Sequence, residues 1–317
     1  MRTTPLAALL ALVLVAPTSG CDTVSSTDDW ALLDAGIWHT CGIKTDGSIE
    51  CWGAGLETSP CNYTDRACGQ GLPPEGTWQD VAAAELHTCG LDSDSAIQCW
   101  GTEFDNRATP PTGVFSAVDT HWDHSCGVRP DGSIECWGAN DHGELDVPTS
   151  AFTQVAIGLY HGCALDENGA VECWGGGESG QYRSPEGTFV QISAGLYHNC
   201  GVTTDGAAVC WGCEHFPLGE DNGQCEVEEG DYVKVAAGVY HTCGLKTDGT
   251  IACWGCQGDE VDADYGQCGV KGAFFEDVTA SSFHTCAIKD VGRVVCWGCQ
   301  SPGVGETKPD LGQCTPP

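Results

Sequence analysis

The sequence contains little methionine and little positive charge: one methionine, and 12 lysine and arginine residues against 45 aspartate and glutamate residues. With a formal net charge of −33, the chain would repel nucleic-acid phosphates and anionic lipid surfaces. We therefore expect no nucleic-acid partner. Most of the acidity is expected to form a solvated surface that aids solubility. A basic partner or bound calcium is the alternative.

Long apolar runs are also absent, apart from residues 6–16, which are too few to span a bilayer. This run predicts a secretory signal peptide at residues 1–20. Small residues before Cys21 resemble a bacterial lipoprotein processing site, although Thr18 stands where leucine is usual. We predict lipidation of Cys21, a linker over residues 21–29 and no other membrane contact. The mature chain would then lie at the outer membrane or cell surface; cleavage without lipid, giving an extracellular protein, is the alternative.

After the leader there is no helical periodicity, and a repeat takes its place. Histidine, any residue, cysteine, nine residues and then Cys-Trp-Gly occur seven times, starting at His39, His87, His124, His161, His198, His241 and His284. Sequence repeats of this length are typical of propellers and arrays. Glycine-rich turns between short alternating segments indicate strands. We predict one all-β domain over residues 30–317, a seven-bladed β-propeller.

The sixth repeat shows how each blade should fold. Residues 233–238, 241–246 and 250–254 are expected to be three strands. Cys243 and Cys253 are directly opposed only if residues 247–249 form a three-residue loop with Gly249 in the left-handed conformation. The second repeat has Ser95 at this glycine position, so we expect its turn to differ.

Opposed residues on paired strands lie within disulfide reach, which predicts one disulfide inside each blade. The pairs are Cys41–Cys51, Cys89–Cys99, Cys126–Cys136, Cys163–Cys173, Cys200–Cys210, Cys243–Cys253 and Cys286–Cys296. The longer repeats and the tail add four pairs: Cys61–Cys68, Cys213–Cys225, Cys256–Cys268 and Cys299–Cys314. Only Cys21 is left over. Paired thiols as metal sites are the weaker interpretation, because each pair supplies two sulfurs. So many disulfides indicate an oxidising compartment.

Aromatic residues gather just before the repeat histidines. Equivalent positions of a closed propeller form a ring on one face, and aromatic side chains are common interface anchors. The predicted binding residues are Trp38, Trp122, Tyr160, Tyr197, Tyr240 and Phe283. The alternative is that they pack beneath the face and fill the channel.

The histidines do not predict catalysis or a metal site. A histidine that recurs once per blade is expected to hydrogen-bond the strand turn. No Ser/His/Asp or paired-carboxylate pattern stands out, so we expect no enzyme activity, no catalytic residues and no cofactor. Acidic stretches at residues 219–223, 226–231 and 259–264 leave calcium open, although none has the spacing of a helix-flanked calcium loop.

The repeat resembles that of the regulator of chromosome condensation family. The third repeat, residues 136–145, reads Cys-Trp-Gly-Ala-Asn-Asp-His-Gly-Glu-Leu, close to the family's Trp-Gly and Asn-x-x-Gly-Gln-Leu. Gly-Gln-Cys at residues 223–225, 266–268 and 312–314 resembles the same turn, and we expect the last copy to close the ring. Given its leader and cysteines, the chain resembles a secreted, disulfide-rich bacterial lipoprotein branch of this family.

The resemblance implies a monomeric binding scaffold with a protein or peptide partner. The family includes a nucleotide-exchange factor for a small nuclear GTPase, and export argues against that role here. A carbohydrate- or cell-wall-binding module, possibly hydrolytic, and a purely structural surface protein remain alternatives.

Overall fold

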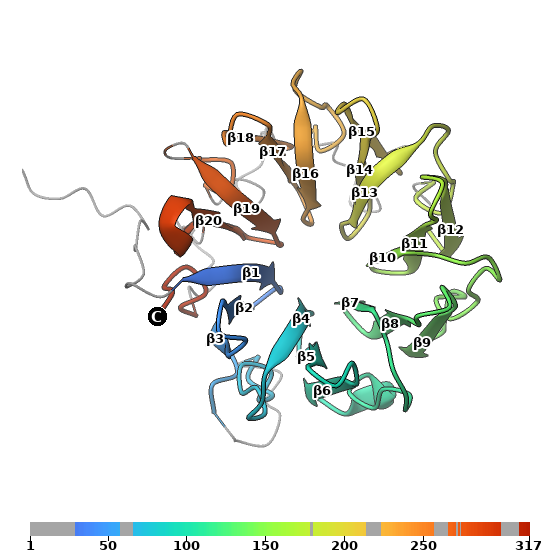
Figure 1. The fold of residues 1–317 in the computed structure, drawn as a ribbon, viewed down its shortest axis with the longest axis vertical. Helices are drawn as coiled ribbons and strands as arrows, with labels where there is room; N and C mark the ends of the chain where they lie inside the picture. The colour runs from blue at the N-terminus through green and yellow to red at the C-terminus, as the bar shows by residue number, and fades with distance from the viewer. Residues whose placement is uncertain are drawn as a thin grey trace, which may run out of the picture.

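The computed structural model describes residues 29–57, 66–177, 180–213, 223–256, 266–270, 272, 274–298 and 311–317. Within them, seven antiparallel sheets of three strands stand around a central axis (Figure 1). The predicted seven-bladed β-propeller is confirmed. No helix in this part of the chain has the length and apolarity needed to cross a bilayer. The leader, Cys21 and most of the linker lie outside the described residues.

The innermost strand of each blade is the first in sequence, and these seven strands surround the axis (Figure 1). They are β1 (Trp30–Ala35), β4 (Trp78–Ala83), β7 (Ala117–His121), β10 (Gln154–Ile157), β13 (Phe189–Ala194), β16 (Tyr232–Ala237) and β19 (Phe275–Ala280).

The middle strand begins at or just after the repeat histidine and is almost entirely buried, because blades cover both of its faces. The middle strands are β2 (His39–Lys44), β5 (His87–Asp92), β8 (His124–Val128), β11 (His161–Leu165), β14 (Asn199–Thr203), β17 (Thr242–Lys246) and β20 (His284–Lys289).

The third strand of each blade contains the Cys-Trp of the repeat and lies farthest from the axis. These strands are β3 (Ile49–Gly53), β6 (Ile97–Gly101), β9 (Ile134–Gly138), β12 (Val171–Gly175), β15 (Ala208–Trp211), β18 (Ile251–Trp254) and β21 (Arg293–Gly298). Two short 3₁₀ turns, η1 (Phe104–Asn106) and η2 (Asp290–Gly292), complete the described elements.

The cysteines follow the expected register. In all seven blades the two cysteines are directly paired across the middle and third strands and form a disulfide, with Cα atoms 4.0–4.1 Å apart. Cys213–Cys225 and Cys256–Cys268 are also formed. Cys68 and Cys314 are disulfide-bonded, and the partners predicted for them, Cys61 and Cys299, lie outside the described residues.

The third-strand tryptophans lie between blades and tie each blade to its neighbour. In five blades the indole N–H donates to the carbonyl of a residue 30 positions earlier, as in Trp100 to Gln70 at 2.8 Å and Trp254 to Gln224 at 2.9 Å. Trp211 Nε1 has no hydrogen-bond partner among the described residues. In the first blade, Trp52 donates to the carbonyl of Gln313 at 2.8 Å. The C-terminal segment therefore closes the ring, as the sequence predicted.

The prediction that Ser95 alters its turn is wrong. Ser95 adopts a φ of 62°, and its N–H donates to the Asp92 carbonyl at 3.0 Å, as Gly47 does to Lys44 in the first blade. The disulfide and the packed inner strand fix the loop length, so serine is held in a conformation that glycine adopts without cost.

Replacing Ser95 by glycine should therefore raise the free energy of unfolding by about 0.5–1 kcal/mol, because the left-handed backbone is no longer strained. The reciprocal change, Gly47→Ser at φ +82°, should lower it by about 1 kcal/mol. Guanidinium unfolding of the disulfide-intact protein measures both. Shifts of the same sign would show that backbone strain does not control this turn.

Candidate functional site: the channel and the aromatic face

The repeat histidines join neighbouring blades. All seven are fully buried, and six donate or accept through Nε2 to the side chain that lies between histidine and cysteine in the next blade. The pairs are His39–Thr88 (2.7 Å), His87–Ser125 (3.0 Å), His161–Asn199 (2.8 Å), His198–Thr242 (2.8 Å), His241–Thr285 (2.8 Å) and His284–Thr40 (2.8 Å). The prediction that these histidines bond the strand turn is wrong, because Nε2 bonds a side chain on the middle strand of the next blade.

The hydroxyl partners settle which nitrogen carries the proton. Thr242 donates its single hydroxyl hydrogen to the Gln224 carbonyl at 3.1 Å, so it can only accept from His198. His198 is then neutral with the proton on Nε2. Burial lowers its pKa to about 3, which agrees with a neutral ring. An Nε2 atom that donates in this way cannot be a metal ligand or a general base.

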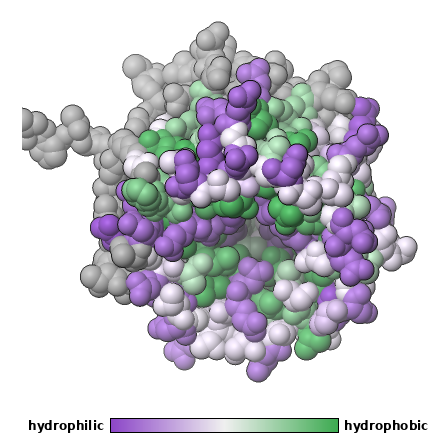
Figure 2. Space-filling model, turned by 45° about the horizontal axis from the view of Figure 1, so that its top comes forward, coloured by the Kyte–Doolittle hydropathy of each residue, from purple (hydrophilic) through white to green (hydrophobic). Residues whose placement is uncertain are grey.

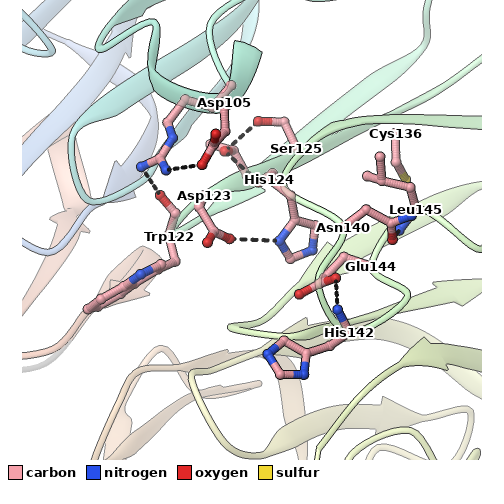
Figure 3. A network of polar contacts seen from close by, with 12 residues as sticks. Asp105, Trp122, Asp123, His124, Ser125, Cys136, Asn140, His142, Glu144 and Leu145 are labelled. Carbon is pink, nitrogen blue, oxygen red and sulfur yellow. Dashed lines mark hydrogen bonds and ion pairs between the residues drawn. The ribbon is translucent and has the colours of Figure 1, made fainter.

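One junction lacks this bond. His124 would meet the side chain of residue 162, but that residue is glycine, and the Trp174 ring occupies the space where its Cβ would lie. Neither ring nitrogen of His124 has a hydrogen-bond partner among the described residues. Its Nδ1 lies 3.6 Å from Asp123 Oδ1 (Figure 3). The junction between the third and fourth blades is therefore held without the histidine bond.

The inner strands enclose a channel of about 250 Å³. Its polar side chains bond the backbone of the next blade: Asp34 accepts from the Ala83 N–H at 2.6 Å, and Asp119 accepts from Ile157 at 2.7 Å. Burial raises the pKa of Asp34 and of Asp80 to about 6 and that of Asp119 well above its usual range. These carboxyl groups connect neighbouring blades, although burial makes their charged form unfavourable.

The predicted binding residues divide into two groups. Trp38 is 3% exposed and packs on Phe283, with ring centroids 5.2 Å apart. Trp122, Tyr160, Tyr197 and Tyr240 are half-buried and pack on an apolar cluster of Leu159, Leu196 and Val239. Trp122 also contacts the cluster that contains Trp38.

The face around the channel mouth is therefore partly apolar and partly filled. Figure 2 shows a hollow in the middle of one side of the molecule, with hydrophobic residues along its rim. The structure places the predicted aromatic residues in two apolar clusters that share Trp122. Trp38 is part of the core, whereas the other five keep some exposed surface.

A pocket beside Trp122 was not predicted. Arg66, Glu85, Leu86, Phe104, Arg107 and Trp122 line it. Arg66 and Arg107 are two of only 12 basic residues, and both lie in irregular segments that follow a Trp-Gly. The sequence signal for this pocket was the presence of basic residues in irregular segments of an acidic chain. The repeat periodicity does not predict where these segments lie in the fold, so the pocket could not be located from it.

No group of three histidine, cysteine, aspartate or glutamate side chains arranged to hold a metal occurs in the described part of the chain. Of the acidic stretches considered for calcium, residues 259–264 and most of 219–223 lie outside it. In residues 226–231, the Tyr232 hydroxyl donates to the Glu228 carbonyl at 2.8 Å.

The fold and its face define a propeller-type scaffold. Four of its repeats, at residues 152–181, 189–216, 232–267 and 275–303, match the family model described as the regulator of chromosome condensation (RCC1) repeat. These four blades are thus regulator of chromosome condensation repeats. No curated protein matches it in sequence.

Solved structures share the fold at low sequence identity. The ectodomain of the receptor kinase CR4 from Physcomitrella patens is 21% identical with a TM-score of 0.68, covering 89% of this chain and 76% of the ectodomain. The CRINKLY WD40 ectodomain of the Arabidopsis thaliana receptor kinase ACR4 is 23% identical with a TM-score of 0.65, covering 86% and 98%. Prp20p from Saccharomyces cerevisiae is 18% identical with a TM-score of 0.63, covering 90% and 86%.

Replacing Thr242 by valine tests the contribution of the histidine bonds between blades. It leaves the His198 Nε2–H without an acceptor in a dry interface, and we expect a loss of about 2 kcal/mol in the free energy of unfolding. The control is Thr204→Val at an exposed position, with an expected change within about 0.5 kcal/mol. Both are measured by guanidinium unfolding. Equal losses would refute a special role for the buried bond.

Acid should destabilise the protein. Five repeat histidines and His121 have their pKa lowered from 6.5 to about 3 or 4 by burial, so below pH 6.5 the unfolded chain binds more protons. Asp34 and Asp80, with pKa values raised to about 6, act in the opposite direction between about pH 4 and 6, and Asp119, whose pKa is also raised, acts in the same way as these two. His87, whose pKa is lowered by burial, acts with the other histidines. Seven histidines outweigh three carboxyl groups, so stability should fall by several kcal/mol per pH unit.

The measurement is the melting temperature of the disulfide-intact protein from pH 7 to pH 4. A steep fall that begins near pH 6.5 is expected. A melting temperature that stays constant or rises on acidification would show that the channel carboxylates dominate the titration and not the histidines.

Proposed function

We propose that the chain is a non-enzymatic scaffold that binds a protein partner through the aromatic face around the channel mouth. The observation that carries this is the row of half-buried tyrosines from three consecutive blades. Burial raises the pKa of the Tyr197 phenol, and the phenols of Tyr240 and Tyr160 raise it further. The three phenols therefore lie near one another. Rigid, partly exposed aromatic side chains are favoured interface anchors because binding them costs little conformational entropy.

The comparisons support a binding role in general terms. The solved structure of Prp20p is described with its binding to Gsp1p and histones, so a propeller of this fold can serve as a protein-binding scaffold. A guanine-nucleotide exchange role does not suit an exported, disulfide-rich chain. The disulfides support an oxidising, extracellular environment. We further propose that Cys21 is lipidated and tethers the scaffold to a bacterial cell envelope, as in a lipoprotein.

The test is affinity capture from a cell-envelope extract of the source organism, comparing the disulfide-intact protein with the Tyr160→Ala, Tyr197→Ala, Tyr240→Ala triple variant. We expect a partner that the native protein retains and the triple variant loses. The matched control is Val190→Ala with Val233→Ala. These exposed residues lie at the opposite ends of β13 and β16 from the aromatic face, because Phe189 pairs with Thr203 and Ala194 with Asn199.

Melting temperatures of all variants must stay within a few degrees for the comparison to count. Capture by the triple variant at native levels would overturn the proposed face. Binding of glycans by the native protein and not by the triple variant would replace the protein partner by a carbohydrate.

A further inference from the structure

The pocket beside Trp122 has a volume of about 500 Å³ and opens on the aromatic face. Glu85 and Leu86 immediately precede His87, and Trp122 lies two residues before His124, so these three come from the same end of their blades as the tyrosines. Phe104 belongs to η1 and is 58% exposed. The pocket thus combines an exposed phenyl ring with the half-buried Trp122 indole.

Two guanidinium groups and one carboxylate, Glu85, line the pocket, so its lining has a formal charge of +1 in a chain that is otherwise strongly acidic. Arg66 stacks on Trp38, with its Cζ 3.7 Å from the ring centroid, and its side chain is 39% exposed. Its Nη1 lies 3.6 Å from Glu85 Oε1, beyond hydrogen-bond distance. The stacking holds the guanidinium plane against the indole, and Glu85, which also lines the pocket, is its ion-pair partner.

Arg107 is held from within the fold. It is 6% exposed, its Nε donates to the Phe104 carbonyl at 2.9 Å, and its Nη1 donates to the Trp122 carbonyl at 3.4 Å. Asp105 lies 3.9 Å from Nη2. Figure 3 labels Asp105 and Trp122, the partners in two of these contacts. Arg107 therefore positions Phe104 and Trp122 and adds positive potential to the pocket wall.

Backbone strain concentrates at the same place. In the described part of the chain, six residues other than glycine have a positive φ. Arg66 and Trp122, at 54° and 44°, line the pocket, and Asp105 and Asn106, at 55° and 60°, lie in the turn between Phe104 and Arg107. Such conformations cost on the order of 1–3 kcal/mol each and cluster at ligand-binding sites.

We propose that this pocket receives a segment of the protein partner in which a carboxylate side chain adjoins a large apolar one. The carboxylate would pair with the Arg66 fork, and the apolar side chain would pack between Phe104 and Trp122. The proposal rests on the proposed function and names the chemistry of its partner. Charge complementarity favours this occupant, because the pocket lining, with two arginines and one glutamate, is formally +1 in a chain with a net charge of −33.

The experiment is selection from a displayed library of random peptides on the native protein and on Arg66→Gln. We expect the native protein to enrich peptides that contain aspartate or glutamate beside phenylalanine, tryptophan or leucine. A synthetic copy of an enriched peptide should bind about tenfold more weakly when its acid is changed to the amide, or when the protein carries Arg66→Gln. Phe104→Ala should weaken it similarly.

Arg129→Gln is the matched control, because Arg129 is paired with Glu135 on the hairpin at the other end of its blade. Its affinity should equal that of the native protein. The proposed occupant of the pocket is overturned by any of three outcomes: the selection enriches no peptide, the enriched peptides lack an acid, or Arg66→Gln binds them with unchanged affinity. If the envelope partner is lost by the triple tyrosine variant and retained by Arg66→Gln, the aromatic face stands and only this inference fails.

Discussion

Side-chain contact between neighbouring blades is the constraint on which this structure depends. Each sheet has three strands and shares none with its neighbours. Single backbone hydrogen bonds, such as Trp78 N–H to the Gly47 carbonyl at 2.9 Å, cross between blades. Three sets of side-chain contacts add to them: tryptophan to carbonyl, histidine to hydroxyl or amide, and channel carboxylate or amide to backbone N–H. The first two also occur at the junction between the last and first blades, where Thr279 takes the place of the carboxylate and accepts from the Ala35 N–H at 3.1 Å.

The disulfides solve a different problem. A three-stranded sheet of short strands is barely stable alone, and each blade must keep its register before its neighbours can pack on it. A disulfide between directly opposed cysteines fixes that register and adds up to about 3 kcal/mol per closed loop in the chain-entropy model. Because a disulfide holds the register of each blade, the contacts between blades can include buried histidines and carboxylates. These groups destabilise the folded state outside a narrow pH range.

The irregular segments between blades supply the charged and exposed aromatic side chains of the face. The aromatic residues come from equivalent positions and make an almost continuous apolar surface, whereas the Arg66 and Phe104 pocket comes from segments that differ between repeats. Repetition thus provides the anchor surface, and departures from repetition provide the chemistry that could select a partner.

The sequence alone determined the blade number, the hairpin register and the seven internal disulfides, because these follow from spacing within one repeat and from local turn chemistry. It also indicated that residues near Gly312 close the ring. Contacts between repeats were decided by the tertiary structure. Only the packed ring shows that His198 bonds Thr242 and that His124 faces Gly162. Only packing places Arg66 on Trp38, since no periodicity links a residue in an inserted segment to a position of the repeat.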